Sequence, residues 1–255
     1  MDKVRGIFFY SMDKLPIPLS IIAIRKEVNM MIDKKHEKIK EIVEKELSCS
    51  AHNLDHVMRV YNLCLLLAEH EENVDLHVLI PAALLHDIAR VKESNDNTGK
   101  TDHAILGSEI AGRILRDLEY GEDKIEEIKH CIASHRFRSG NEPRTIEAKI
   151  LFDADKLDSL GAIGIARTFM ISGQFGQKLS TNLFSKKYMV ENTTENGRLK
   201  DVSKHSPFIE YEVKLKKIPE KLYTKKAKEI GIDRLNFMNE FFNRLSMEIE
   251  GMRLV

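Results

Sequence analysis

The sequence predicts an all-α protein, a compact multi-helix bundle with a C-terminal helical extension, on three observations. Proline and glycine number only six and thirteen among 255 residues, and tryptophan is absent. The chain is rich in leucine, isoleucine, lysine and glutamate, which is typical of helices rather than of a β-sandwich or barrel. Several segments repeat apolar residues at spacings of three and four, the period of a helix with one buried face.

The first elements follow from this periodicity. Residues 34–47 form the first one-faced pattern, and Asn53 is placed to cap a second, longer core helix. Residues 76–88 are almost continuously apolar but too short to span a membrane, so we predict a buried helix there. The polar stretch at 92–101, with its asparagines and a glycine, is predicted to be a loop.

Three further helices are predicted at 103–118, 123–134 and 145–157, and their short connections imply packed neighbours. The segment from Gly161 onward is interpreted as helix packing, and the last part of the chain as a closing helix. The predicted organisation is therefore an N-terminal extension at 1–33, a main helical domain at 34–178, a polar loop or flap at 179–206, and C-terminal helices at 207–255 that pack on the main domain.

Residues 1–33 need a separate interpretation because two short apolar runs follow Lys3 and Arg5. Prolines and charges interrupt the runs, and no small-residue cleavage site follows, which argues against an export signal. We expect a poorly ordered or loosely docked extension. A membrane-surface anchor, or translation that begins at Met30 or Met31, stays open as an alternative.

Charge and cysteine content exclude some classes of protein. The formal net charge is zero, so there is no overall basic field to attract nucleic acid, which is not expected as a partner. Cys49, Cys64 and Cys131 are odd in number and form no C-x-x-C pair, which argues against a disulfide framework or zinc ribbon. A cytoplasmic location is expected, no transmembrane span is predicted, and a homo-oligomer stays open.

The residues that indicate chemistry are carboxylates and histidines in apolar surroundings. Asp87 lies in the run LLHDI, and Asp153 and Asp155 lie in ILFDADKL. An ionised carboxylate in such a run needs a cation or several donors, and a bound metal would supply the charge. His86 and Asp87 would leave a helix about 100° apart, which suits neighbouring positions around one ion.

His56 from the preceding helix and Asp155 from a later one would complete a mixed nitrogen and oxygen set with His86 and Asp87. Two imidazoles and two carboxylates suit Mn, Fe, Ni, Co or Zn better than Ca or Mg. The sequence thus predicts a divalent transition metal on packed helices.

Three segments in order resemble the HD-domain superfamily of metal-dependent phosphohydrolases, in which a His precedes an HD dipeptide and a distant Asp. They are HNLDHVMRV, AALLHDIAR and EAKILFDADKLDSLGAIGIAR. The closing text TKKAKEIGIDRLNFM is similar to that of small bacterial and archaeal members. This resemblance, rather than the spacing, assigns His56, His86, Asp87 and Asp155 as metal ligands.

The resemblance also suggests roles for three more histidines. His103 and His135 fall where some members place histidines that bind a second metal or the substrate phosphate, so with Asp87 they are our candidate catalytic residues. His52 is interpreted as a substrate contact or a support for the ligands. Many relatives follow that His with Asp, whereas Asn53 stands here and cannot supply a carboxylate charge.

Some assignments stay open between function and surface pairing. Arg59 and Lys92 are candidates to bind phosphate, and Arg167 is a candidate partner for a carboxylate. Asp158 is a candidate neighbour of the metal, with the helix surface as the alternative. Residues 213–228 also hold seven lysines against one glutamate, either a local anion-attracting surface or a solvated helix face.

The predicted function is metal-dependent hydrolysis of a phosphate ester, of a nucleotide or another small phosphorylated metabolite, by metal-activated water. No phosphate-binding loop of the nucleoside-triphosphatase type and no serine-hydrolase motif occurs. The alternative is a metal-containing protein that binds a nucleotide or regulates without turnover. The sequence does not specify the substrate, the metal or the number of metals.

Overall fold

The computed structural model describes residues 34–47, 54–136, 140–179, 191–192 and 199–252, and within them every regular element is helical. The helices are, in order, α2 (Lys34–Glu46), α3 (Leu54–Ala68), α4 (Leu76–Leu85), α5 (Arg90–Ser94), α6 (His103–Asp117), α7 (Glu122–Ser134), α8 (Ile146–Leu157), α9 (Gly161–Gln174), η1 (Val202–Lys204), α11 (Pro207–Val213), η2 (Leu215–Lys217), η3 (Pro219–Lys221) and α12 (Lys225–Ile249). The predicted all-α class is confirmed. Within the described part of the chain, no helix combines the length and apolar character needed to cross a membrane.

Polar side chains set several helix starts. Asp75, Asp102 and Thr145 each accept a hydrogen bond from a backbone N–H in the first turn of α4, α6 and α8. Such caps satisfy donors that have no partner within the helix. Asn53, the predicted cap of α3, and the extension at 1–33 lie outside the described residues.

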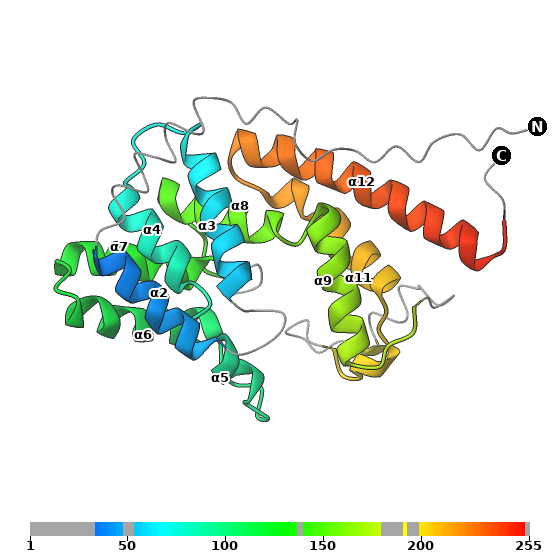
Figure 1. Ribbon diagram of the computed structural model, residues 1–255, viewed down its shortest axis with the longest axis horizontal. Helices are drawn as coiled ribbons and strands as arrows, with labels where there is room; N and C mark the ends of the chain where they lie inside the picture. Colours follow the sequence, from blue (N-terminus) through cyan, green and yellow to red (C-terminus); the bar gives the residue numbers. More distant parts are fainter. Residues whose placement is uncertain (1–33, 48–53, 137–139, 180–190, 193–198, 253–255) are drawn as a thin grey trace, which may run out of the picture.

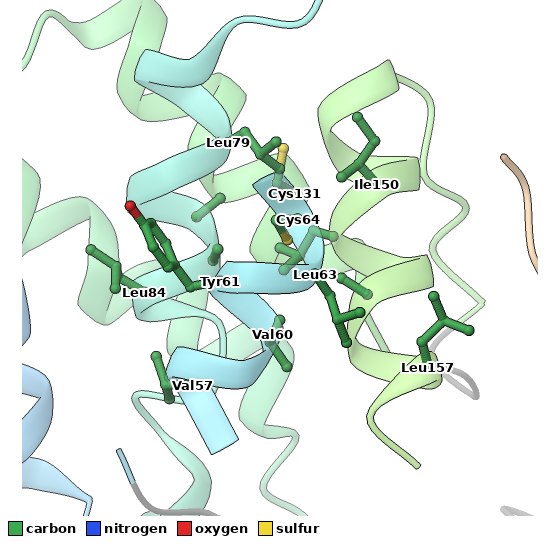
Figure 2. Packing of buried hydrophobic residues seen from close by; sticks show 14 of the residues in the cluster. Val57, Val60, Tyr61, Leu63, Cys64, Leu79, Leu84, Cys131, Ile150 and Leu157 are labelled. Atoms are coloured by element: carbon green, nitrogen blue, oxygen red, sulfur yellow. The ribbon is translucent and has the colours of Figure 1, made fainter. Parts of the chain in front are cut away.

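The hydrophobic core lies where α3, α4, α7 and α8 meet. Figure 2 shows α3 contributing Val60, Leu63 and Cys64 to this core, close to side chains of the neighbouring helices. Helix α4 is buried from Val78 to Leu85, as its nearly continuous apolar sequence predicts. Burial on this scale dominates the stability of a domain of this size.

The C-terminal helices form the other end of the molecule. Figure 1 shows α9, α11 and α12 beside one another, away from α2, α4, α6 and α7. Aromatic rings join these three helices, and the Phe242 ring of α12 stacks on Tyr211 of α11 with centroids 4.2 Å apart. Helix α12 also contacts α8, which carries one of the predicted ligands.

Two local predictions were wrong. Helix α4 ends at Leu85, so His86 and Asp87 lie in the turn that follows it instead of inside a helix. In this turn the Ile88 N–H donates to the Leu85 carbonyl, the short i to i+3 bond that tightens a last turn. The polar stretch predicted as a loop begins inside the short helix α5, which ends at Ser94.

Candidate metal centre

Two groups of side chains meet between the helices. Among the described residues, each group has one nitrogen or oxygen atom per residue that could bind a metal, and within a group these atoms all lie within 4.8 Å of one another. The first group is His56, His86 and Asp155, and the second is Asp87, His103 and His135. They come from the start of α3, the turn after α4, the first residue of α6, the end of α7 and the end of α8.

Asp87 joins the two groups into one centre. Its Oδ2 atom lies 3.6 Å from His56 Nε2 and 3.9 Å from His86 Nε2. Its Oδ1 atom lies 3.4 Å from His103 Nε2 and 3.7 Å from His135 Nε2. The carboxylate therefore presents a different oxygen to each histidine pair, and it can bridge two cations.

Backbone carbonyls fix the tautomers of His86 and His135. His86 Nδ1 lies 2.8 Å from the Ala83 carbonyl oxygen, and His135 Nδ1 lies 2.6 Å from that of Ile132. A carbonyl oxygen only accepts, so the proton is assigned to Nδ1 and the Nε2 lone pair faces the centre. This is how proteins present a histidine to a metal.

Carboxylates fix the other two histidines. His56 Nδ1 lies 2.8 Å from Asp158 Oδ2, and His103 Nδ1 lies 2.8 Å from Glu93 Oε2. Both arrangements match the carboxylate–histidine pairs that orient metal ligands. Arg90 also approaches His103 Nδ1, but its guanidinium always donates, so it is assigned to the Glu93 carboxylate, 2.7 Å away.

Neighbouring cations keep these supporting carboxylates ionised. Burial opposes ionisation of Glu93, but the hydrogen bond from His103 and the charges of Arg90 and Arg136 lower its pKa to about 2. Burial likewise opposes ionisation of Asp158, and the hydrogen bonds from His56 and Arg59 lower its pKa overall.

The electrostatics of the ligands suit a metal. Burial lowers the pKa of His86 to about 4, so its imidazole is neutral at pH 7. Burial also lowers the pKa of His103. Burial raises the pKa of Asp155, but the Lys156 ammonium and His56 outweigh burial and hold this pKa well below its usual range. Neutral imidazoles and ionised carboxylates are the forms that bind a metal.

His56 differs from the other ligands. Burial lowers its pKa, but the carboxylates of Asp155 and Asp158 outweigh burial and raise it. Its Nε2 atom lies 3.3 Å from His86 Nε2, and His103 and His135 make the same 3.3 Å approach. Two lone pairs cannot face each other at this distance without a proton or cation between them. The donor set therefore fits a divalent transition metal in the first group, and a second in the other.

A cavity of about 290 Å³ opens onto the centre. Asp87, His103, His135 and Asp155 line it, whereas His56 and His86 are not part of its wall. Five cationic side chains of the described residues also line it, Arg90, Arg136, Lys156, Arg167 and Lys214. An apolar part of the wall comes from Ile171, Leu215 and Ile218.

The remaining predicted site residues lie elsewhere. Arg59 is one-third exposed and donates to Asp158 at 2.7 Å, so it contacts a carboxylate that supports His56. The structure does not bring Lys92 to the centre, because its half-exposed side chain pairs with Glu46 on the surface. His52 lies outside the described residues.

The structure adds residues that the sequence analysis did not select. Glu93 lies in the segment predicted to be a loop, and no local pattern distinguished it. Arg90 and Lys156 closely follow the HD pair and Asp155, and this proximity was the available signal. Lys214 belongs to the lysine-rich stretch, for which the sequence allows two interpretations. Arg167 does pair with a carboxylate, that of Asp158.

Comparison with known proteins agrees with this geometry. The HD domain family model matches residues 53–160, which contain all six residues of the two groups. Uncharacterized protein YpgQ of Bacillus subtilis is 30% identical over 226 residues, 86% of this chain and 96% of that protein. The chain belongs to the HD-domain superfamily.

Solved structures share the fold of this HD-domain protein. The crystal structure of Bacillus subtilis YpgQ in complex with ADP has a TM-score of 0.63 at 27% identity, covering 86% of this chain and all of that one. An HD-superfamily hydrolase from Bacillus thuringiensis has a TM-score of 0.62 at 26% identity, covering 87% and 98%. The similarity extends well beyond the segment that carries the ligands.

Proposed function

We propose that this protein is a metal-dependent phosphohydrolase that cleaves a phosphate ester of a nucleotide or another small phosphorylated metabolite. The observation that carries the proposal is the position of Asp87 between two histidine pairs, beside a cavity with five cationic side chains. Family membership and the hydrolase among the solved neighbours support the broader class, a metal-dependent hydrolase.

The ligands divide between two metal positions in this proposal. His56, His86, Asp155 and Asp87 Oδ2 would hold the first, and Asp87 Oδ1, His103 and His135 would hold the second. When bound, such a metal lowers the pKa of a coordinated water and polarises a phosphoryl oxygen.

The protein's own side chains then bind and orient the substrate. Asp87, His103, His135 and Asp155 form part of both the centre and the cavity wall, so these residues meet the reacting group. The cations of the wall offset the charge of a phosphate, which favours an anionic substrate in this partly enclosed space. His56 and His86 do not line the cavity, so in this proposal they bind the metal and do not contact the substrate.

Two observations support a small nucleotide over other phosphate esters. The related YpgQ has been crystallised with ADP. The apolar wall formed by Ile171, Leu215 and Ile218 offers a surface for a base or another apolar group. Nucleic acid is not proposed, because the chain carries no net positive charge.

The test begins with metal content. The protein, purified without chelator, is analysed for transition metals and compared with Asp87→Ala and Asp155→Ala, and helicity is checked by circular dichroism. We expect one or two equivalents in the wild type and clear loss in both variants. Each protein is then assayed against nucleotides and simple phosphomonoesters with each candidate metal.

Turnover by the wild type that disappears in a folded Asp87→Ala variant is the expected result. Tight nucleotide binding without product would instead favour the non-catalytic alternative. A wild type that binds no metal after reconstitution would contradict both, because the donor set would then be purely structural.

A further inference from the structure

Lys156 occupies the junction between the two ligand groups. Its ammonium nitrogen donates to Asp155 Oδ2 at 2.7 Å and to the backbone carbonyl oxygen of His135 at 2.9 Å. Asp155 belongs to the first ligand group and His135 to the second. The side chain is only 12% exposed, and its ammonium lies 5.1 Å from the centre of the Phe152 ring. The cation is therefore held in one place.

The two hydrogen bonds leave one donor of Lys156 for a ligand. A lysine ammonium has three N–H groups, and Asp155 and His135 are its only acceptors among the described residues. Lys156 lines the cavity, so the remaining N–H is available on that side. Lys156 also uses Oδ2 of Asp155, and it leaves the opposite oxygen, Oδ1, facing His56 Nε2 at 3.5 Å.

We propose that Lys156 is a catalytic residue whose third N–H binds an oxygen of the phosphoryl group, in the substrate and in the orthophosphate product. This rests on the proposed function for the identity of the reacting group. A donor that is already fixed needs no reorganisation when charge develops, which is why such donors contribute strongly to catalysis.

Other cations of the cavity wall are less directly placed. Arg136 and Arg167 donate to carboxylates that lie outside the two ligand groups, namely Glu93, Asp102 and Asp158. Lys156 donates both to a ligand carboxylate and to the backbone of a histidine ligand. Its ammonium therefore lies next to a residue of each ligand group.

The competing explanation is that Lys156 only holds Asp155 and the end of α7 in position. The two roles differ in what the variants lose. Loss of positioning would reduce metal content, whereas loss of a substrate contact would weaken phosphate binding while the metal remains. Measurements of metal content and of orthophosphate affinity on the same preparation separate them.

The experiment uses the full-length, metal-loaded protein with Lys156→Met, Lys156→Arg and a matched control, Lys149→Met. Lys149 lies on the same helix, α8, and is not part of the cavity wall. Metal content is measured by elemental analysis, and binding of inorganic phosphate by titration calorimetry. Turnover of the best phosphate ester is measured in parallel.

We expect Lys156→Met to keep the wild-type metal content and to bind orthophosphate about 10- to 100-fold more weakly, the range for a hydrogen bond to a charged group. Turnover should fall about 100-fold, as when one fixed donor is removed from an active site. Lys156→Arg should recover part of both, and Lys149→Met should match the wild type.

Three results would overturn the inference: loss of metal in both folded Lys156 variants, unchanged phosphate affinity, or no phosphate binding by the wild type. If Lys156→Met does not fold, the phosphate affinity of Lys156→Arg is compared with that of the wild type, and an unchanged affinity overturns the inference. A wild type that binds phosphate through Lys156 but hydrolyses no ester would contradict the proposed function and the catalytic role of Lys156, and only its role in phosphate binding would stand.

Discussion

The Nδ1 atom of His56 lies 2.8 Å from a carboxylate oxygen of Asp158, which is 102 positions later in the sequence. The same carboxylate accepts hydrogen bonds from Arg59 of α3 and Arg167 of α9. One buried aspartate thereby connects three helices and directs the Nε2 atom of His56 toward Asp87 and Asp155. Removal of the Asp158 carboxylate should therefore weaken metal binding, although Asp158 itself is not a proposed ligand.

Asp158→Asn should weaken metal binding roughly 10- to 100-fold, the usual cost of losing a group that orients a ligand. Asparagine keeps the size of the side chain but removes the charge that fixes the His56 proton on Nδ1. Competition with a metal-binding dye measures the affinity. Asp117→Asn, an exposed change in the last turn of α6, is the control. Equal affinity in both variants would show that Asp158 does not support His56.

His135→Ala should reduce metal content from two equivalents to one, because only the second group loses a ligand. His86→Ala should chiefly affect the first position. Elemental analysis after removal of excess metal gives the stoichiometry. His130→Ala is the control, since His130 lies on the same helix, α7, but accepts from the Arg144 backbone N–H away from the centre. A wild type with one equivalent, unchanged in His135→Ala, would contradict a second position.

Asp153→Ala should destabilise the protein by about 2–4 kcal/mol with little change in metal content. The fully buried carboxylate of Asp153 accepts from the backbone N–H groups of Tyr223 and Thr224 and from the Thr224 hydroxyl. These bonds fasten the start of α12 to α8. Urea unfolding measures the loss, and a double-mutant cycle with Thr224→Val should show coupling. Additive effects of the two changes would argue against this link.

Gly164→Ala should destabilise the protein by about 2–3 kcal/mol. A Cβ atom at this position would overlap the Ser159 carbonyl oxygen, so the start of α9 would have to move. Gly173→Ala on the same helix is the matched comparison, since a Cβ there meets nothing within 4 Å. That change should be neutral or stabilising by up to about 1 kcal/mol, because alanine favours a helix. Thermal unfolding of both variants gives the contrast, and similar midpoints would be inconsistent with the close approach at Gly164.

Much of the fold could be predicted because helical periodicity is a local property of the chain. The spacing of apolar residues placed the helices within a few residues of their observed bounds, and the apolar run before the HD pair indicated a buried helix. The end of α4 was misjudged because apolar residues continue into the turn. The turn is buried like the helix, so apolar residues occur there for the same reason and the apolar run does not mark where the helix ends.

The candidate ligands were also accessible from the sequence, because histidines and carboxylates in apolar runs require a compensating partner. Which group compensates each buried carboxylate is not determined by its neighbours in the sequence. Asp153 and Asp155 lie in the same apolar run, yet Asp153 binds backbone N–H groups of the C-terminal segment and Asp155 faces the histidines. Residues two apart on a helix point to nearly opposite sides, and only packing decides what lies on each side.

The sequence by itself therefore determined the helical class, most helix positions and the set of polar groups that must be compensated inside the protein. Tertiary structure alone decided that Lys156 joins the two ligand groups while Lys92 stays on the surface, and that Glu93 and Asp158 support His103 and His56. The reason is physical. Periodicity depends on neighbours along the chain, whereas hydrogen bonds and ion pairs join atoms from helices that are far apart in sequence.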